Sequence, residues 1–197
     1  MRRFAASLAL ALGLVLPLAQ AAAQQAVTVE GANFERAFYL VGHKVFLNGA
    51  GLGSQGDAKP YAAGLYLSRP ARQLGEAQAA PGPKRLQIVL KQEMDSKQLG
   101  NLLSQALRSN LTGAELAGCL PGLAQLGQML GAKKKLAAGD QLSLDSVMGQ
   151  GTHVSVNGQR QILIEGPLFF DCVLKGYLGA QPSDTALRQS LLAAMPR

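Results

Sequence analysis

A glycine-rich segment between two apolar runs constrains the fold of this chain more than any other feature. The segment runs from Val45 to Ser68, VFLNGAGLGSQGDAKPYAAGLYLS, and four of the eight residues from 49 to 56 are glycine. Glycine tolerates positive φ, and glycines at this density mark a chain reversal between extended segments. We therefore predict a β-hairpin with a long loop, built from Asn48, Gly49, Gly51, Gly53, Ser54 and Gly56.

The second strand of this hairpin has small residues at its centre. Because side chains alternate along a strand, one face carries Tyr61, Ala63, Leu65 and Leu67, and the other carries Ala62, Gly64 and Tyr66. A glycine in mid-strand marks a place where another element comes close. We interpret Gly64 as the contact point of a packed helix, with a ligand as the alternative.

The first 23 residues have the pattern of a secretory signal peptide. Arg2 and Arg3 precede an apolar segment, and small residues follow it up to Ala23. A membrane anchor is the alternative, but the apolar run is short for a membrane span. We predict cleavage of residues 1–23, one domain over residues 24–197, and an exported, periplasmic protein with no transmembrane span after cleavage.

The charge balance argues against a nucleic-acid partner. Loss of Arg2 and Arg3 lowers the formal net charge from +7 to +5, and the chain has no tryptophan. The one dense basic run, Lys133–Lys135, follows a helical pattern, where cations complement the helix dipole. We interpret the run as a solvated face, with an anion or membrane-surface site as the alternative, and no aromatic residues interleave with basic ones.

Strand and helix patterns alternate along the rest of the chain. Residues 84–91 alternate as a strand, and Asp95 starts a helix with a buried stripe. Thr112 and Glu115 form a capping box for a second helix, in which Pro121-Gly122 predicts a kink or a break into two short helices. The stripe of the first helix consists of Leu99, Leu102, Leu103, Ala106 and Leu107.

The C-terminal part returns to strands and then to helices. Strand patterns lie at 142–146, 153–156 and 161–164, with an Asn157-Gly158 hairpin turn. Pro167 opens a helix that Gly179 closes, and Ser183 or Asp184 caps a last one. These patterns predict an α+β domain with a mostly antiparallel sheet and a layer of helices on one face.

Four pieces of the chain, in this order, resemble the chalcone isomerase-like family. They are the opening hairpin, the helical pair from Ser96 to Met129, GTHVSVNGQ from Gly151, and GPLFFDCVLKGYLGAQPSD from Gly166. The resemblance covers about residues 38–192. It implies an open-faced β-sandwich with a cleft between sheet and helices, where the plant enzymes of the family close a flavanone ring without a cofactor.

The chain departs from the family at the positions that the resemblance makes catalytic. The family's arginine, which polarises the substrate carbonyl, falls on Gly53. Its threonine falls on Tyr61, its tyrosine near Met94, and a hydroxyl residue on Gly176, whereas Asn101 keeps an amide. A glycine cannot supply the preorganised cation that stabilises an enolate, so chalcone cyclisation is not expected.

A second branch of the resemblance binds fatty acids without catalysis. We therefore predict a non-catalytic protein that binds a fatty acid or other amphipathic small molecule, with no cofactor. The alternative is an isomerase of the intramolecular lyase type that uses Tyr61 and Asn101 as donors. The expected cleft is lined by Tyr61, Ala63, Gly64, Asn101, Leu103 and Leu107.

The cysteines and histidines give little sign of other chemistry. Cys119 and Cys172 lie on apolar sides of predicted helices, so either a disulfide or two buried thiols fits the sequence. His43 and His153 have no carboxylate or cysteine at a short ligand spacing, so no metal site is predicted.

Overall fold

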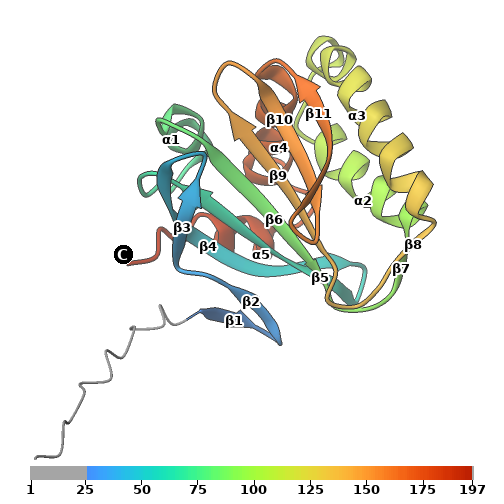
Figure 1. Cartoon of the computed structure of the whole chain (residues 1–197), viewed down its shortest axis with the longest axis horizontal. Helices are drawn as coiled ribbons and strands as arrows, with labels where there is room; N and C mark the ends of the chain where they lie inside the picture. The colour runs from blue at the N-terminus through green and yellow to red at the C-terminus, as the bar shows by residue number, and fades with distance from the viewer. Residues whose placement is uncertain (1–25, 197) are drawn as a thin grey trace, which may run out of the picture.

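A seven-stranded antiparallel sheet forms the centre of the protein (Figure 1). The structure is a computed structural model that describes residues 26–196, so the predicted signal peptide lies outside the described residues. All neighbouring strands in the sheet pair in antiparallel fashion. In spatial order the strands are β11 (Gln159–Glu165), β10 (Gly151–Val156), β9 (Gln141–Val147), β6 (Lys84–Leu90), β5 (Ala58–Leu67), β4 (His43–Gln55) and β3 (Ala37–Leu40).

The helices gather on one face of this sheet, where their apolar residues and the inward residues of the strands form the main core. The predicted α+β class, with a layer of helices on one face, is therefore confirmed. The helices are α1 (Leu74–Ala79), α2 (Ser96–Arg108), α3 (Gly113–Lys133), α4 (Leu168–Leu178) and α5 (Thr185–Leu191).

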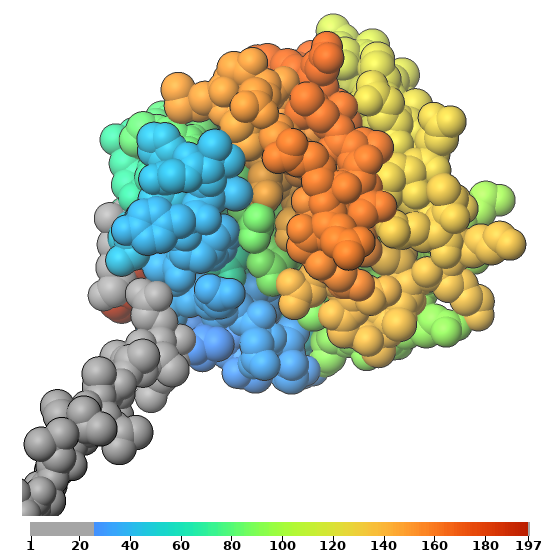
Figure 2. All heavy atoms as spheres, viewed as in Figure 1, coloured from blue at the N-terminus to red at the C-terminus, as the bar shows by residue number. Residues whose placement is uncertain are grey.

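The other face of the sheet carries a smaller core under a short hairpin. Strands β1 (Val27–Val29) and β2 (Ala32–Phe34) form this hairpin, and Phe34 packs with Ala62 and Tyr66 of β5. Figure 2 shows this face hollowed between the N-terminal strands and the β10–β11 pair. A second small pair, β7 (Met94–Asp95) with β8 (Lys135–Leu136), joins the start of α2 to the end of α3.

The glycine-rich segment is a strand and not a loop, so that part of the hairpin prediction is wrong. Strand β4 runs through all of the glycines from Gly49 to Gly53, and only Gly56 and Asp57 form the turn to β5. The reason lies in a distant element. A Cβ at Gly49 would lie 2.0 Å from the carbonyl oxygen of Ser190, and a Cβ at Gly51 would lie 2.4 Å from the Ser190 Cβ.

The missing side chains thus let α5 pack directly on β4. The buried side chain of Asn48 strengthens this contact. Its Nδ2 donates to the carbonyl oxygens of Ala71 and Leu191 at 2.9 and 2.7 Å, and its Oδ1 accepts from the amide of Ala71 at 2.8 Å. Hydrogen bonds satisfy this buried amide, which fixes the C-terminal end of α5 on the sheet.

Gly64 permits a close contact on the opposite face of the sheet. A Cβ there would lie 2.6 Å from the Phe34 ring, so an aromatic side chain of β2 occupies the space above it. The close approach predicted from the sequence is confirmed, but the neighbour is a strand residue and not a helix.

The helix boundaries follow most of the sequence signals. Asp95 caps α2 by accepting from the amide of Lys97, the Thr112–Glu115 capping box starts α3, and Asp184 caps α5. Pro121 lies inside α3, which is one helix of 21 residues, so of the two alternatives, a kink or a break into two short helices, the break is wrong. Among the described residues, no helix is long and apolar enough to cross a membrane.

The contact between β4 and α5 predicts a large effect of one methyl group. Gly49→Ala would place a Cβ against a backbone carbonyl that cannot move cheaply, so we expect a loss of about 3 kcal/mol in the free energy of unfolding. Urea denaturation measures it. Gly75→Ala is the control, because a Cβ at Gly75 in α1 meets no atom within 4 Å. Equal stability of Gly49→Ala and the wild type would contradict this account.

Candidate functional site

On the face of the sheet that the helices cover, a tyrosine ring fills the space at Gly53, the position of the family's arginine. The ring of Tyr61 on β5 lies across Gly53 on β4, where a Cβ would be 2.0 Å from the Tyr61 Cζ. Tyr61 is 6% exposed, and its side chain hydrogen-bonds with that of Tyr177 on α4. The tyrosine ring therefore fills the space that a longer side chain at residue 53 would need.

Burial raises the pKa values of both phenols. It raises the pKa of Tyr61 to about 12 against the opposing effect of the Tyr177 hydrogen bond, and it raises the pKa of Tyr177 well above its usual value. The nearby carboxylate of Asp184 raises both values further. This pair can therefore bridge β5 to α4, but it supplies no phenolate or cation at neutral pH.

Asp184 is held by its own hydrogen bonds. It accepts from the amide and Oγ of Ser54 at 2.7 and 2.5 Å and from the amide of Leu187 at 2.9 Å. Partial burial raises the pKa of Asp184, but the hydrogen bonds from Leu187 and Ser54, together with Lys59, outweigh burial and lower it. The carboxylate thus joins the end of β4 to the start of α5.

The other residues expected to line a cleft lie in several places. Ala63 and Leu103 are packed in the main core, and Leu107 packs with Cys119 and Cys172. Gly64 lies on the opposite face of the sheet, under Phe34. Asn101 is exposed on α2, on the side away from its buried stripe. The structure therefore does not bring Tyr61 and Asn101 into one site.

Two further positions at which the chain departs from the family are packing positions. Met94 is 1% exposed in the core, and a Cβ at Gly176 would lie 2.9 Å from the Ala106 carbonyl oxygen. Gly176 thus permits a close contact between α4 and α2.

A groove does exist, but it lies between α2 and α3, which run side by side at one edge of the molecule (Figure 1). Its volume is about 560 Å³. Leu123 and Leu126 of α3 provide apolar surface, and Asn101 borders the groove. The remaining lining residues are Asp95, Ser96, Lys97, Gly100, Ser104, Gly127, Gly131 and Lys134.

Three glycines make this groove wide. A Cβ added to Gly100, Gly127 or Gly131 would meet no atom within 4 Å, unlike one added to Gly49 or Gly53. These glycines are therefore not explained by helix packing, and they carry a cost in helix propensity. The signal was present in the sequence, since Gly127 and Gly131 are one helical turn apart, but our prediction placed the cleft under the helices.

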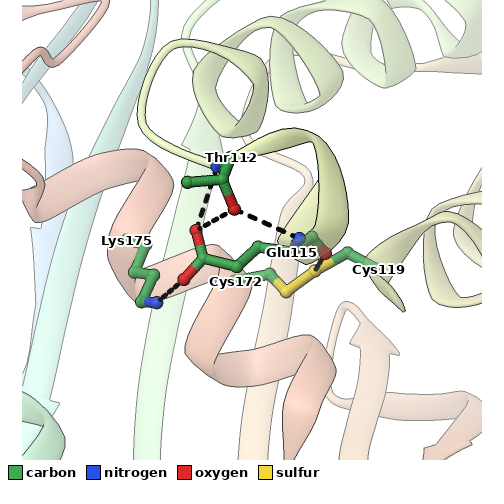
Figure 3. Close-up of a disulfide and its surroundings, with 5 residues drawn as sticks. All are labelled: Thr112, Glu115, Cys119, Cys172 and Lys175. Atoms are coloured by element: carbon green, nitrogen blue, oxygen red, sulfur yellow. Dashed lines mark hydrogen bonds and ion pairs between the residues drawn. A yellow bond between two sulfur atoms is a disulfide. The ribbon is translucent and has the colours of Figure 1, made fainter. Parts of the chain in front are cut away.

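Three interactions fix the wall formed by α3, and Figure 3 shows the disulfide and the ion pair among them. Cys119 and Cys172 form a disulfide that joins α3 to α4, with Cα atoms 6.5 Å apart, so the alternative of two thiols is set aside. One turn earlier, Glu115 of the capping box pairs with Lys175 of α4. At the far end of α3, the β7–β8 pair holds it beside the start of α2. Helix α3, which forms this wall of the groove, is thus held in place at both of its ends.

Comparison with known proteins agrees with this fold. A family model described as chalcone isomerase-like matches residues 26–193. The chain belongs to the chalcone isomerase-like family. The crystal structure of an Arabidopsis thaliana fatty-acid binding protein matches this chalcone isomerase-like protein with a TM-score of 0.60 and 15% identity, covering 82% of this chain and 92% of the other.

At that identity the likeness shows the fold alone. No curated protein matches this chalcone isomerase-like chain in sequence. Within residues 26–196, no group of three or more histidine, cysteine or acidic side chains is placed to hold a metal ion.

The disulfide predicts a measurable loss of stability on its removal. It closes a loop with a sequence separation of 53, for which chain entropy gives about 4 kcal/mol. Urea denaturation of the oxidised protein and of the Cys119→Ala/Cys172→Ala variant should differ by about this amount. Thiol titration of denatured, unreduced protein is the check on the premise, and two reactive thiols per chain would contradict it.

The Glu115–Lys175 pair predicts a pH-dependent contribution to stability. Hydrogen bonds from Lys175 and then from Thr112 lower the pKa of Glu115 from 4.5 to about 2. A lowered folded-state pKa means that the contribution is present above pH 4.5 and is lost as the pH falls through about 2. Glu115→Gln keeps a capping side chain, so it should be less stable than the wild type at pH 7 and nearly equal at pH 2. A stability difference that does not change with pH would count against the pair.

Proposed function

We propose that this protein is an exported, non-catalytic binding protein for a fatty acid or other amphipathic small molecule. The groove between α2 and α3 is the observation that carries the proposal, because it combines a volume of about 560 Å³ with apolar surface from Leu123 and Leu126. Small-molecule sites are concave and mostly apolar, with a few polar groups that set orientation. The ligand's apolar part lies along these leucines.

The packing around Gly53 supports a non-catalytic role. No side chain at residue 53 can polarise a carbonyl, and the neutral phenols of Tyr61 and Tyr177 bond to each other in a closed space. Asn101 lies on the far side of α2, so the isomerase alternative has no common site for its two expected donors.

Two further points support the proposal. The Arabidopsis thaliana protein that shares this fold is a fatty-acid binding protein. The pattern of residues 1–23 and the Cys119–Cys172 disulfide both suit an oxidising compartment such as the periplasm, where disulfides persist.

A substitution that fills the groove tests the proposal. Gly127→Leu would add a side chain to open space beside Leu123 and Leu126, so we expect at least a ten-fold loss of affinity for a fluorescent fatty-acid probe, with little loss of stability. Gly113→Leu is the matched control, because Gly113 also has open space but lies at the other end of α3.

The native ligand can be sought directly. Mass spectrometry of extracts from the purified protein should find an amphipathic compound in the wild type and in Gly113→Leu, and less of it in Gly127→Leu. An empty wild-type protein with no affinity for long-chain acids would refute the proposal.

A further inference from the structure

The groove between α2 and α3 contains a buried hydroxyl group without a partner. Ser96 lines the groove at the start of α2 and is 3% exposed. Its amide donates to the carbonyl oxygen of Lys134 at 3.0 Å, but its Oγ has no hydrogen-bond partner among the described residues. Buried polar side chains are nearly always hydrogen-bonded, so each exception calls for an explanation.

The charges at this end of the groove favour an anion. Lys97 and Lys134 both line it and are exposed, and the N-terminal end of α2 adds its positive dipole. The acidic residue of the lining, Asp95, accepts from the amide of Lys97 at 2.7 Å as the helix cap. This end of the groove therefore carries two cationic side chains and one carboxylate, and the carboxylate already accepts a hydrogen bond from the helix backbone.

The apolar surface lies elsewhere in the same groove. Leu123 and Leu126 belong to the middle of α3, whereas Ser96 and Lys134 lie where β7 and β8 join the two helices. The groove is therefore polar and cationic at one end and apolar further along. A ligand of matching chemistry has a charged head at one end of an alkyl chain.

We propose that the groove binds amphiphiles with an anionic head group in one orientation, with the head at Ser96 and the tail along Leu123 and Leu126. This inference rests on the proposed function and adds the polarity and direction of the ligand. The enclosed Ser96 side chain turns toward the groove and donates a hydrogen bond from its Oγ to a head-group oxygen, and Lys97 and Lys134 balance the head-group charge. The site selects an anionic amphiphile over a neutral one with the same tail.

Isothermal titration calorimetry with dodecanoate and 1-dodecanol, each at a concentration at which it is monomeric in solution, tests the inference. Dodecanoate should bind the wild type about ten-fold more tightly than 1-dodecanol, the size of one hydrogen bond to a charged acceptor. Ser96→Ala should remove about that factor for dodecanoate and leave 1-dodecanol unchanged. Lys97→Gln/Lys134→Gln should weaken dodecanoate alone and reduce the effect of added salt on its affinity.

Thr152→Val is the matched control. Thr152 Oγ1 is the other buried hydroxyl oxygen without a partner among the described residues, and it lies on β10, outside the groove lining. Its loss should leave both affinities unchanged.

Other ligands test the head group and the tail separately. Dodecyl phosphate that binds more tightly than dodecanoate supports the same inference with a phosphate head. Acetate or inorganic phosphate that binds as tightly as dodecanoate overturns the role of the tail.

The failures of the two proposals are distinguishable. Equal affinity for dodecanoate and 1-dodecanol, or an unchanged dodecanoate affinity in Ser96→Ala, overturns the head-group inference and leaves the binding function standing. Binding of neither compound overturns the binding function itself.

Discussion

The ring of Tyr61 packed across Gly53 is the contact on which the rest of this structure depends. Gly53 has no side chain, so the ring lies directly against β4 and its hydroxyl reaches Tyr177 on α4. The same strand exposes Gly49 and Gly51 to α5, which packs on it as closely. The sheet and these helices therefore pack closely at the position of the family's arginine.

The groove that Asn101 borders lies within the helical layer. Helix α2 buries Leu99 and Leu103 in the main core and presents Asn101 on its other side, toward the groove that it shares with α3. The disulfide and the ion pair to Lys175 hold α3 against α4. The position of this wall of the groove therefore does not depend only on contacts between α3 and α2. A site that is formed before the ligand arrives loses less entropy on binding.

The parts of the fold that depend on local signals could be predicted from the sequence. The alternation of Lys84–Leu90 gave strand β6, and Asp95, Thr112 and Asp184 marked three helix starts, because caps and periodicity act within a few residues. Local glycine content pointed to a loop at 49–53 instead of a strand. The strand forms there because of α5, about 140 residues later, and no local pattern contains that contact.

The candidate site was predicted less well for the same reason. Asn101 was identified through the resemblance to the family, but its surroundings depend on α3, and the open glycines Gly127 and Gly131 have meaning only once α2 lies beside them. The orphan hydroxyl of Ser96 likewise follows from tertiary burial, which a single serine before a helical pattern does not reveal.

The location of the bound tail is the central claim, and a crystal structure with a fatty acid brominated at its terminal carbon tests it most directly. The anomalous signal of bromine marks the end of the tail without reference to any model of the ligand. The account predicts a bromine peak between α2 and α3 beside Leu123 and Leu126. A peak between the sheet and the helices beside Tyr61 would contradict it.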